Sequence, residues 1–186
     1  QQRHPGNRGR CIASSRTVSE TFVRLCEIRS PTGEEREIAD SVAAELRALG
    51  LEVSEDDAAG PAEAGAGNLL ARMPGASDEW VMFCAHLDTV PHRGLVEVVE
   101  DGGVFRSRGE TILGADNKAA VAVFMELVAR HAQAPPPIGI ELVFTVAEEQ
   151  GLRGAKALDA SSLRSRGGFV LDHAGPVGEV IVTTPT

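Results

Sequence analysis

The sequence predicts an α/β fold, with a mixed, mostly parallel sheet flanked by helices. Three apolar runs of strand length, 81–85, 140–146 and 168–171, are separated by segments whose apolar residues have helical spacing. Runs that are apolar along most of their length indicate strands buried on both faces, which is typical of a sheet covered by helices. The chain of 186 residues is long enough for one domain, or one domain with a short arm.

Two amphipathic helices are expected before the first apolar run. Apolar residues recur at helical spacing from Thr17 to Ile28, and Pro31 ends that stretch. The same spacing returns from Gly33 to Leu49, with acidic residues in its first turn. Gly50 then occupies the position of a C-terminal helix cap. Both segments are therefore predicted to be helices that pack one face against the sheet.

Shorter elements complete the predicted pattern. Residues 54–67 are acidic, rich in Ala and Gly and aperiodic, which predicts a loop. The sequence also predicts a strand over 69–73, a hairpin of 95–99 with 104–105, a helix over about 117–131 and a short helix after Gly151.

Composition and charge exclude several classes of protein. Apolar residues make up 42% and charged residues 24%, as in an ordinary globular chain. The net charge of −9, the lack of Tyr and the single Trp argue against a nucleic-acid partner. No apolar run is long enough to cross a bilayer, so no membrane association is expected. Three Cys without a CxxC pair favour a reducing compartment, and we expect a cytoplasmic location.

Residues 1–16 differ in charge from the rest of the chain. They carry four Arg and no acidic residue, so all the negative charge lies in the remainder. They contain no apolar core of the kind that a secretory signal needs. We expect residues 1–16 to be a disordered basic arm, with an organellar transit peptide as the alternative.

Each of the three apolar runs ends in ionisable residues. These are His86 and Asp88 after the first run, Glu148 and Glu149 after the second, and Asp172 after the third. Ligands of open α/β sheets bind beyond the carboxyl ends of the strands, so these side chains are expected to converge. The alternative is that they are exposed residues at strand-to-loop junctions. Three such ends in one chain favour a functional site.

The carboxylates expected at this edge of the sheet need a counter-charge. They are Asp88, Asp116, Glu148, Glu149 and Asp172. Like charges at close range raise one another's pKa and destabilise the site. A divalent cation removes this conflict because it requires deprotonated oxygen and imidazole ligands. Imidazole with carboxylates suits Zn²⁺, Mn²⁺ or Co²⁺ better than Mg²⁺ or Ca²⁺, and the amount of charge makes a two-metal centre plausible.

Taken alone, each of these motifs has a simpler explanation. His86 and Asp88 project to one side of an extended chain, so one can orient the other at a metal, but such triplets are common by chance. Glu148 and Glu149 precede a Gln-Gly turn, where one can bind metal and the other act as a base. Adjacent acidic residues more often form a solvated surface. Asp116 stands just before an apolar helix, where an N-cap aspartate is the alternative.

Several segments form a combined pattern when their order and separations are considered together. They are residues 86–91 (HLDTVP), 114–118 (GADNK), 147–151 (AEEQG) and Asp172. This combination resembles the M20 family of di-zinc exopeptidases and deacylases. Residues 31–35 (PTGEE) and 151–155 (GLRGA) are similar to the peptidase T-like members of that family. The resemblance covers about residues 17–186.

The resemblance implies a zinc-exopeptidase-like (phosphorylase/hydrolase-like) fold and a role for each site residue. Two divalent metal ions are implied, Zn²⁺ in the first instance and Mn²⁺ or Co²⁺ as alternatives. The implied metal ligands are His86 and Asp172 for one ion, Glu149 for the other and Asp116 between them. Asp88 would orient His86. Glu148 would be the general base for a metal-bridging water that attacks the amide bond.

The implied activity is aminopeptidase-type hydrolysis of short peptides. The alternatives are an N-acyl amino acid deacylase of the same family and a non-catalytic, metal-binding homologue. Family members insert a lid domain, through which they often dimerise, and then return to supply a final metal-binding His. The sequence stops at Thr186, about where the lid would begin. We therefore expect residues 17–186 to be the N-terminal portion of a catalytic domain, truncated before the lid and weakly active or inactive alone.

Overall fold

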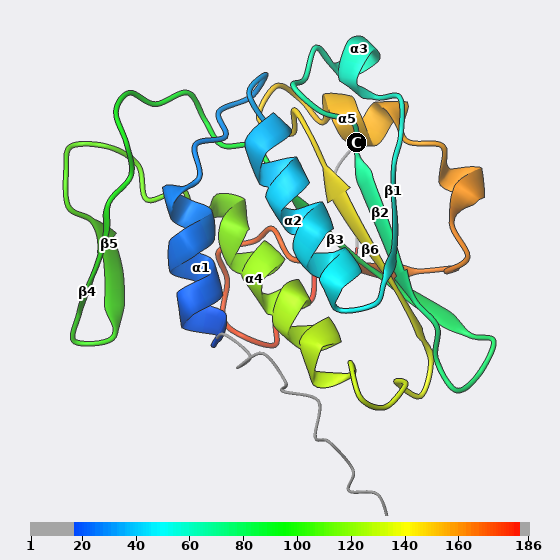
Figure 1. Ribbon diagram of the computed structural model, residues 1–186. Coiled ribbons are helices and arrows are strands. Elements are labelled where there is room, and N and C mark those ends of the chain that lie inside the picture. Colours follow the sequence, from blue (N-terminus) through cyan, green and yellow to red (C-terminus); the bar gives the residue numbers. More distant parts are fainter. Residues whose placement is uncertain (1–16, 183–186) are drawn as a thin grey trace, which may run out of the picture.

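The computed structural model describes residues 17–182 (Figure 1). The basic arm predicted over residues 1–16 lies outside the described part, as do residues 183–186. The described chain contains a five-stranded sheet in the order β1-β2-β6-β3-β7 and a separate two-stranded sheet, β4-β5. The large sheet forms the centre of the molecule, and the small one extends to the side (Figure 1).

Four of the five strands in the large sheet run in the same direction. β6 and β7 both pair with β3 in parallel, β2 is antiparallel to β6, and β1 is antiparallel to β2. Only β2 therefore runs against the others, which confirms the predicted mixed, mostly parallel sheet. The strands are β1 (Glu52–Glu55), β2 (Leu69–Met73), β3 (Trp80–His86), β6 (Gly139–Thr145) and β7 (Gly168–Val170).

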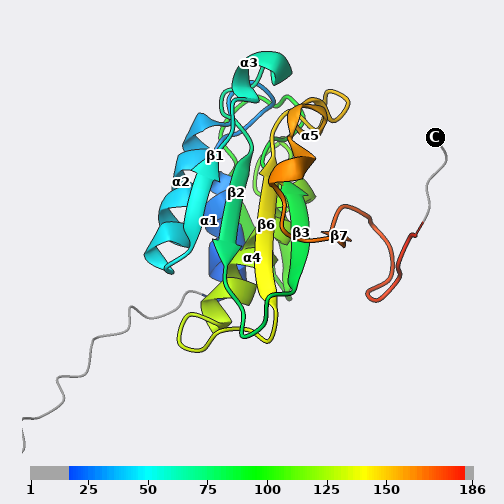
Figure 2. The same ribbon diagram turned by 90° about the vertical axis from the view of Figure 1, so that its right-hand side faces the viewer.

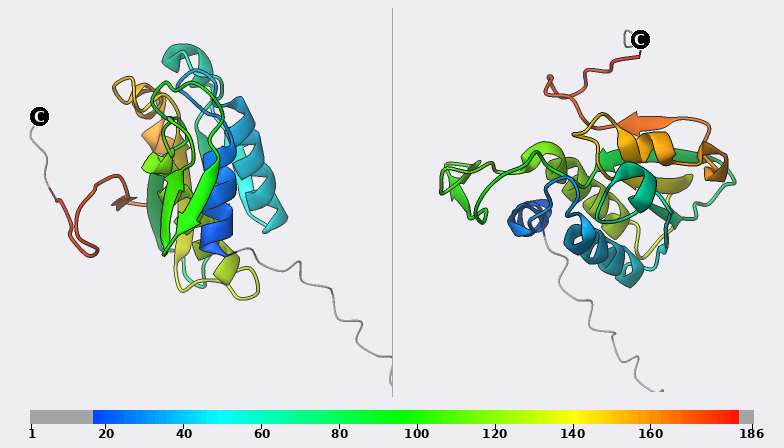
Figure 3. Two further views of the ribbon diagram at one scale, coloured as in Figure 1. Left: turned by 90° about the vertical axis from the view of Figure 1, so that its left-hand side faces the viewer. Right: turned by 90° about the horizontal axis from the view of Figure 1, so that it is seen from above.

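Three longer helices pack on one face of the sheet (Figures 1 and 2). They are α1 (Val18–Glu27), α2 (Arg36–Ala48) and α4 (Ala115–Arg130). The short helix α5 (Arg153–Ala157) lies on the opposite side of the sheet (Figure 3). A 3-10 turn, η1 (Ala160–Ser162), follows it. Among the described residues, no helix combines the length and apolar character that a membrane crossing requires.

The first two helices begin differently, for local reasons. α1 starts with a capping box, in which the Thr17 hydroxyl accepts from the Glu20 amide at 3.2 Å and Glu20 accepts from the Thr17 amide at 2.7 Å. The second helix was predicted from Gly33 but begins at Arg36. The Glu35 carboxylate accepts the Gly33 amide at 3.0 Å, which holds residues 33–35 in a turn.

The three apolar runs are strands, but they are not equally covered. All seven residues of β6 are buried because β6 lies between β2 and β3. β7 pairs only with β3 at the edge of the sheet, and Phe169 and Val170 are 51% and 63% exposed. The prediction that every apolar run is buried on both faces is therefore wrong for β7, and also for β3, where residues 80–84 are only half-buried. The apolar pattern of a short run does not report how far the finished sheet covers it, since even β3, which lies between β6 and β7, is only partly buried.

The predicted loop over 54–67 is wrong at its start and in its middle. β1 extends to Glu55, and residues 59–62 form one turn of helix, α3 (Ala59–Ala62). β1 carries little apolar side chain, so its pairing with β2 decides its conformation. The predicted hairpin is present as β4 (Val98–Asp101) and β5 (Val104–Ser107). Its Phe105 ring meets the Phe22 ring of α1 edge-on, with centroids 5.4 Å apart.

Candidate metal centre

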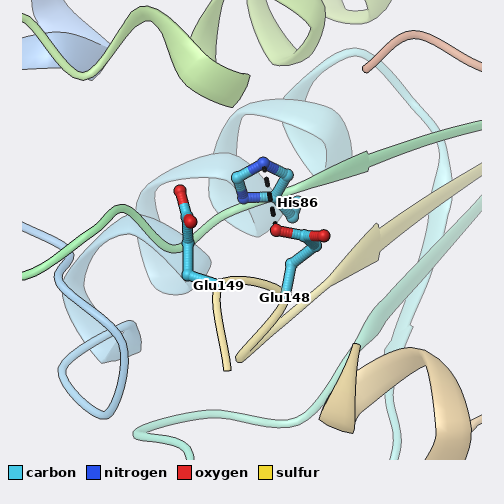
Figure 4. A group of neighbouring side chains, drawn as sticks. All are labelled: His86, Glu148 and Glu149. Atoms are coloured by element: carbon cyan, nitrogen blue, oxygen red, sulfur yellow. Dashed lines mark ion pairs between the residues drawn. The ribbon is translucent and has the colours of Figure 1, made fainter. Parts of the chain in front are cut away.

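The predicted site residues meet beyond the carboxyl ends of three parallel strands. His86 is the last residue of β3, Glu148 and Glu149 follow β6, and Asp172 follows β7. Asp116 joins them from the first turn of α4. Figure 4 shows His86 with the two glutamates directed towards it. Side chains from four segments that are distant in sequence therefore share one small region.

Two groups of side chains in this region can each hold a metal ion. Within each group the ligand atoms lie within 4.8 Å of one another, and His86 belongs to both groups. One group is His86, Glu148 and Glu149, and the other is His86, Asp116 and Asp172. The His86 Nε2 atom is 3.2 Å from an oxygen of Asp116, 3.8 Å from one of Asp172 and 3.9 Å from one of Glu148.

The orientation of the His86 ring is fixed by Asp88. The His86 side chain is 2% exposed, and its Nδ1 atom lies 2.8 Å from the Asp88 carbonyl oxygen. A carbonyl oxygen only accepts, so Nδ1 carries the proton and donates it there. The Asp88 carboxylate lies 3.5 Å from the same nitrogen. Nε2 then faces the carboxylates and is the nitrogen that can bind a metal once it has lost its proton, the arrangement that metal-bound histidines require.

Asp88 also fixes the backbone of both site glutamates. Its side chain is fully buried, and its two oxygens accept the amides of Glu148 at 2.9 Å and Glu149 at 3.2 Å. The Thr32 hydroxyl donates to it at 2.8 Å. Burial alone would raise the pKa of Asp88, but the bonds from His86, Glu148 and Thr32 outweigh it and lower that pKa. Asp88 is therefore held as an anion that orders the centre.

The charges of the cluster perturb the acid–base properties of its members. Burial, reinforced by neighbouring carboxylates, raises the pKa of Glu148, Glu149 and Asp172 despite the opposing effect of His86. Burial alone would lower the pKa of His86, but the bond and charge of Asp88 and the charges of Asp172 and Glu148 outweigh it and raise the value to about 9. The donor set thus carries more negative charge than it can balance internally, which fits a divalent cation.

Asp116 does not cap the helix that it begins. The N-cap of α4 is Gly114, whose backbone is left-handed at φ 76°, and no side chain bonds to the free amides there. Asp116 itself is non-helical, and its side chain is 75% exposed and faces His86. The adjacent Asn117 donates to the Leu171 carbonyl at 2.9 Å, which ties this turn to the residue before Asp172. The N-cap alternative is therefore wrong.

The remaining described histidines take no part in either group. His173 is exposed beside Asp172, and His131 ends α4. His92 is half-buried and lines a cavity of about 470 Å³ with Arg93, Glu110, Thr111 and their neighbours. Within residues 17–182, His86 is thus the only imidazole in the two groups.

Sequence reasoning missed the residues that brace this centre from behind. The Ser30 hydroxyl donates to the Leu87 carbonyl at 2.9 Å, and Thr32 bonds to Asp88. Glu35 and Asn68 are buried polar side chains that bond to the segment before Glu148. Residues 31–35 belonged to the recognised pattern, but their chemistry did not reveal this role, and no local signal marks Asn68.

A family model places this arrangement among known proteins. The model described as Peptidase family M28 matches residues 68–184, more than half of the chain. The chain belongs to this family of peptidases. The matched part contains every residue of the candidate centre, namely His86, Asp88, Asp116, Glu148, Glu149 and Asp172. This confirms the zinc-exopeptidase type of peptidase expected from the sequence, but the matching model is M28 and not M20, so the M20 family stays a prediction.

Individual relatives align with nearly all of this chain, but the aligned part is only about half of each relative's own length. The uncharacterized protein YqjE of Bacillus subtilis (strain 168) is 39% identical over 94% of this chain and 48% of its own. The structure of aminopeptidase PepT from Bacillus cereus ATCC 10987 matches 89% of this chain and 45% of its own, with 37% identity and a TM-score of 0.84. A tripeptidase structure from Staphylococcus aureus Mu50 matches 85% and 43%, with 37% identity and a TM-score of 0.80. The chain spans about half the length of these relatives.

Proposed function

We propose that this chain carries the metal-binding and catalytic residues of a peptidase T-like aminopeptidase of the M20 type, acting on short peptides. The observation that carries the proposal is the convergence of His86 with carboxylates from three other segments at the carboxyl edge of the sheet. The similarity to an aminopeptidase and a tripeptidase supports it. Residues 17–186 would form the first part of the catalytic domain.

Within this proposal the site residues divide between two metal ions. His86, Asp116 and Asp172 form one group and would hold the first ion, while Asp116 and Glu149 would hold the second, with Zn²⁺, Mn²⁺ and Co²⁺ all suited to these donors. When bound, the ions would polarise the scissile carbonyl and acidify a water molecule. The exposed Asp116 carboxylate is the side of the centre that solvent reaches.

Glu148 is the general base of the proposed reaction. Its carboxylate lies at the edge of the cluster. Its raised pKa is closer to the pH at which the enzyme would work, which suits a group that takes up a proton and releases it again. It would take a proton from the attacking water and pass it to the leaving amine. Asp88 holds the Glu148 amide, so the base has a fixed starting position.

Calorimetric titration with Zn²⁺ and Mn²⁺ tests the metal centre directly. We expect saturable binding by the chain and at least about tenfold weaker binding by Asp116→Ala, because Asp116 is shared between the proposed ions. Asp101→Ala, which removes an exposed carboxylate at the end of β4, is the matched control and should bind like the parent chain. Circular dichroism establishes that each variant is folded. A folded parent that binds neither metal, or unchanged binding by Asp116→Ala, contradicts the proposal.

The affinity of the centre for Zn²⁺ is expected to rise with pH. The pKa of His86 without metal is about 9, so below that pH the ion must displace a proton from the ring. Affinity should increase by up to about tenfold per pH unit from pH 7 towards 9 and then level off. Titrations at pH 7, 8 and 9 measure this slope. A flat profile over that range would show that His86 carries no displaceable proton.

A further inference from the structure

The turn that carries the two site glutamates is held by side chains at four consecutive positions. The amides of residues 146–149 each donate to an oxygen of a side chain that is distant from this turn in the sequence. These bonds are Val146 to Asn68 at 3.2 Å, Ala147 to Glu35 at 3.3 Å, Glu148 to Asp88 at 2.9 Å and Glu149 to Asp88 at 3.2 Å. The polypeptide leaving β6 is therefore bonded residue by residue to fixed acceptors.

The same turn is held from its carbonyl side. The carbonyls of residues 146–148 accept from the amides of residues 151–154 at 2.9–3.1 Å. Between them, Ala147 has a left-handed backbone at φ 49°, which a residue with a Cβ rarely adopts. Such a conformation persists only where the surroundings determine it, and it sets the direction in which the next residues leave β6.

Glu35 is the acceptor at the strained residue. Its side chain is fully buried, and among the described residues no Lys, Arg or His pairs with it. One oxygen accepts the amides of Gly33 at 3.0 Å and Ala147 at 3.3 Å, and the other accepts the Gly65 amide at 2.6 Å. Its carboxylate is thus stabilised by three peptide N–H groups, from the loop before α2, the loop after α3 and the turn after β6.

We propose that Glu35 is a positioning residue of the metal centre. By accepting the Ala147 amide, its carboxylate holds this residue in the left-handed conformation that directs Glu148 and Glu149 towards His86. Asp88 continues the same row of acceptors at the next two amides. The inference rests on the proposed function, because it requires that the two glutamates serve a metal centre.

A purely structural role for Glu35 predicts a different result from a positioning role. If Glu35 only joined the two loops beside α2, its loss would lower stability and leave metal coordination in folded molecules unchanged. A positioning role requires that the coordination itself change. Glu35→Gln keeps the shape of the side chain, but its NH₂ group must face one of the N–H donors that the carboxylate accepts. Glu34→Gln is the matched control, because Glu34 is the neighbouring residue and is exposed, with a surface ion pair to Arg29.

The experiment combines Co²⁺ binding with amide hydrogen exchange. Visible absorption of the Co²⁺-loaded chain reports the geometry around the ion, and its titration gives the affinity. We expect Glu35→Gln to bind Co²⁺ about tenfold more weakly and with an altered spectrum, since residues that orient metal ligands have effects of this size. In the metal-free protein, amides 146–149 should exchange at least about tenfold faster than in the parent chain. Glu34→Gln should match the parent chain in all three measurements.

Three outcomes decide between the alternatives. Wild-type Co²⁺ affinity and spectrum in a folded but less stable Glu35→Gln would overturn the positioning role. If the parent chain itself binds no Co²⁺, the proposed function fails. In that case the hydrogen exchange still tests Glu35: unchanged exchange of amides 146–149 in Glu35→Gln would show that Glu35 does not hold this turn. If Glu35→Gln does not fold, Glu35→Asp keeps the charge but shortens the reach, and the same measurements on it apply the same criteria.

Discussion

Replacing Asp88 by Ala is expected to weaken metal binding by about 100-fold and to lower the free energy of unfolding by about 3 kcal/mol. Asp88 is fully buried and accepts three hydrogen bonds, from the amides of Glu148 and Glu149 and from the Thr32 hydroxyl. Its removal leaves the partly buried amides of Glu148 and Glu149 without these acceptors. It also removes the carboxylate 3.5 Å from His86 Nδ1, although the carbonyl of residue 88 can still accept from that nitrogen, so the turn with both glutamates is affected most.

Calorimetry with Zn²⁺ and urea unfolding of the metal-free chain measure the two effects of Asp88→Ala separately. Asp88→Asn keeps the volume and one acceptor, so its loss in both measurements should be smaller than that of Asp88→Ala. Asp101→Ala, exposed in the hairpin, controls for the loss of one negative charge. A loss of stability with unchanged Zn²⁺ affinity would show that Asp88 supports only the fold and not metal binding.

Replacing Glu141 by Ala is expected to lower the free energy of unfolding by about 3 kcal/mol without changing metal affinity. Glu141 is fully buried in the middle of β6, where the sequence shows only an interruption of an apolar run. It accepts from Arg72 at 2.9 Å, from the amides of Arg164 and Ser165 at 3.0 and 2.8 Å, and from the Ser165 hydroxyl at 2.6 Å. Its loss leaves these donors without their acceptor, and Arg72 without its charge partner, far from the candidate centre.

The contribution of Glu141 should depend on pH in a defined direction. Burial alone would raise its pKa, but the bonds from Ser165, Arg164 and Arg72 outweigh it and lower the pKa below its ordinary value of 4.5. A carboxylate with a lowered folded-state pKa stabilises the protein above its unfolded-state pKa, and this stability is lost as the pH falls through the folded-state pKa. The difference in unfolding free energy between the parent chain and Glu141→Gln should therefore be largest near neutral pH and narrow below pH 4.5.

Urea unfolding at several pH values between 7 and 3 tests this dependence. Glu100→Gln, an exposed glutamate of β4, is the control and should follow the parent chain throughout. A constant difference between the parent chain and Glu141→Gln across the whole range would mean that the charge of Glu141 contributes nothing to stability. If replacing Glu141 changed the affinity for Zn²⁺, then Glu141 and its hydrogen-bond partners would be coupled to the metal centre, contrary to our expectation.

Local patterns predicted the elements that form the frame of the site. Apolar runs located β3, β6 and β7 to within two residues at each end, and helical spacing located α1, α2 and α4 to within three. Local patterns failed where pairing decides the conformation, as in the exposed strand β1. They failed again on burial, as at Phe169 in β7, because an apolar run does not report how far the finished sheet covers it.

The sequence by itself determined which side chains stand at the ends of the strands, because the strand runs and the ionisable residues after them are local features. The candidate metal ligands could therefore be named before the fold was known. Only the tertiary structure decided what holds them. The Glu35 and Ala147 pair is separated by 112 residues and the Asp88 and Glu148 pair by 60, so no local spacing relates them. Packing α2 against β1 and β2, together with the pairing of β3 with β6, brings these acceptors to the amides of 146–149, because buried N–H groups must find partners wherever the fold supplies them.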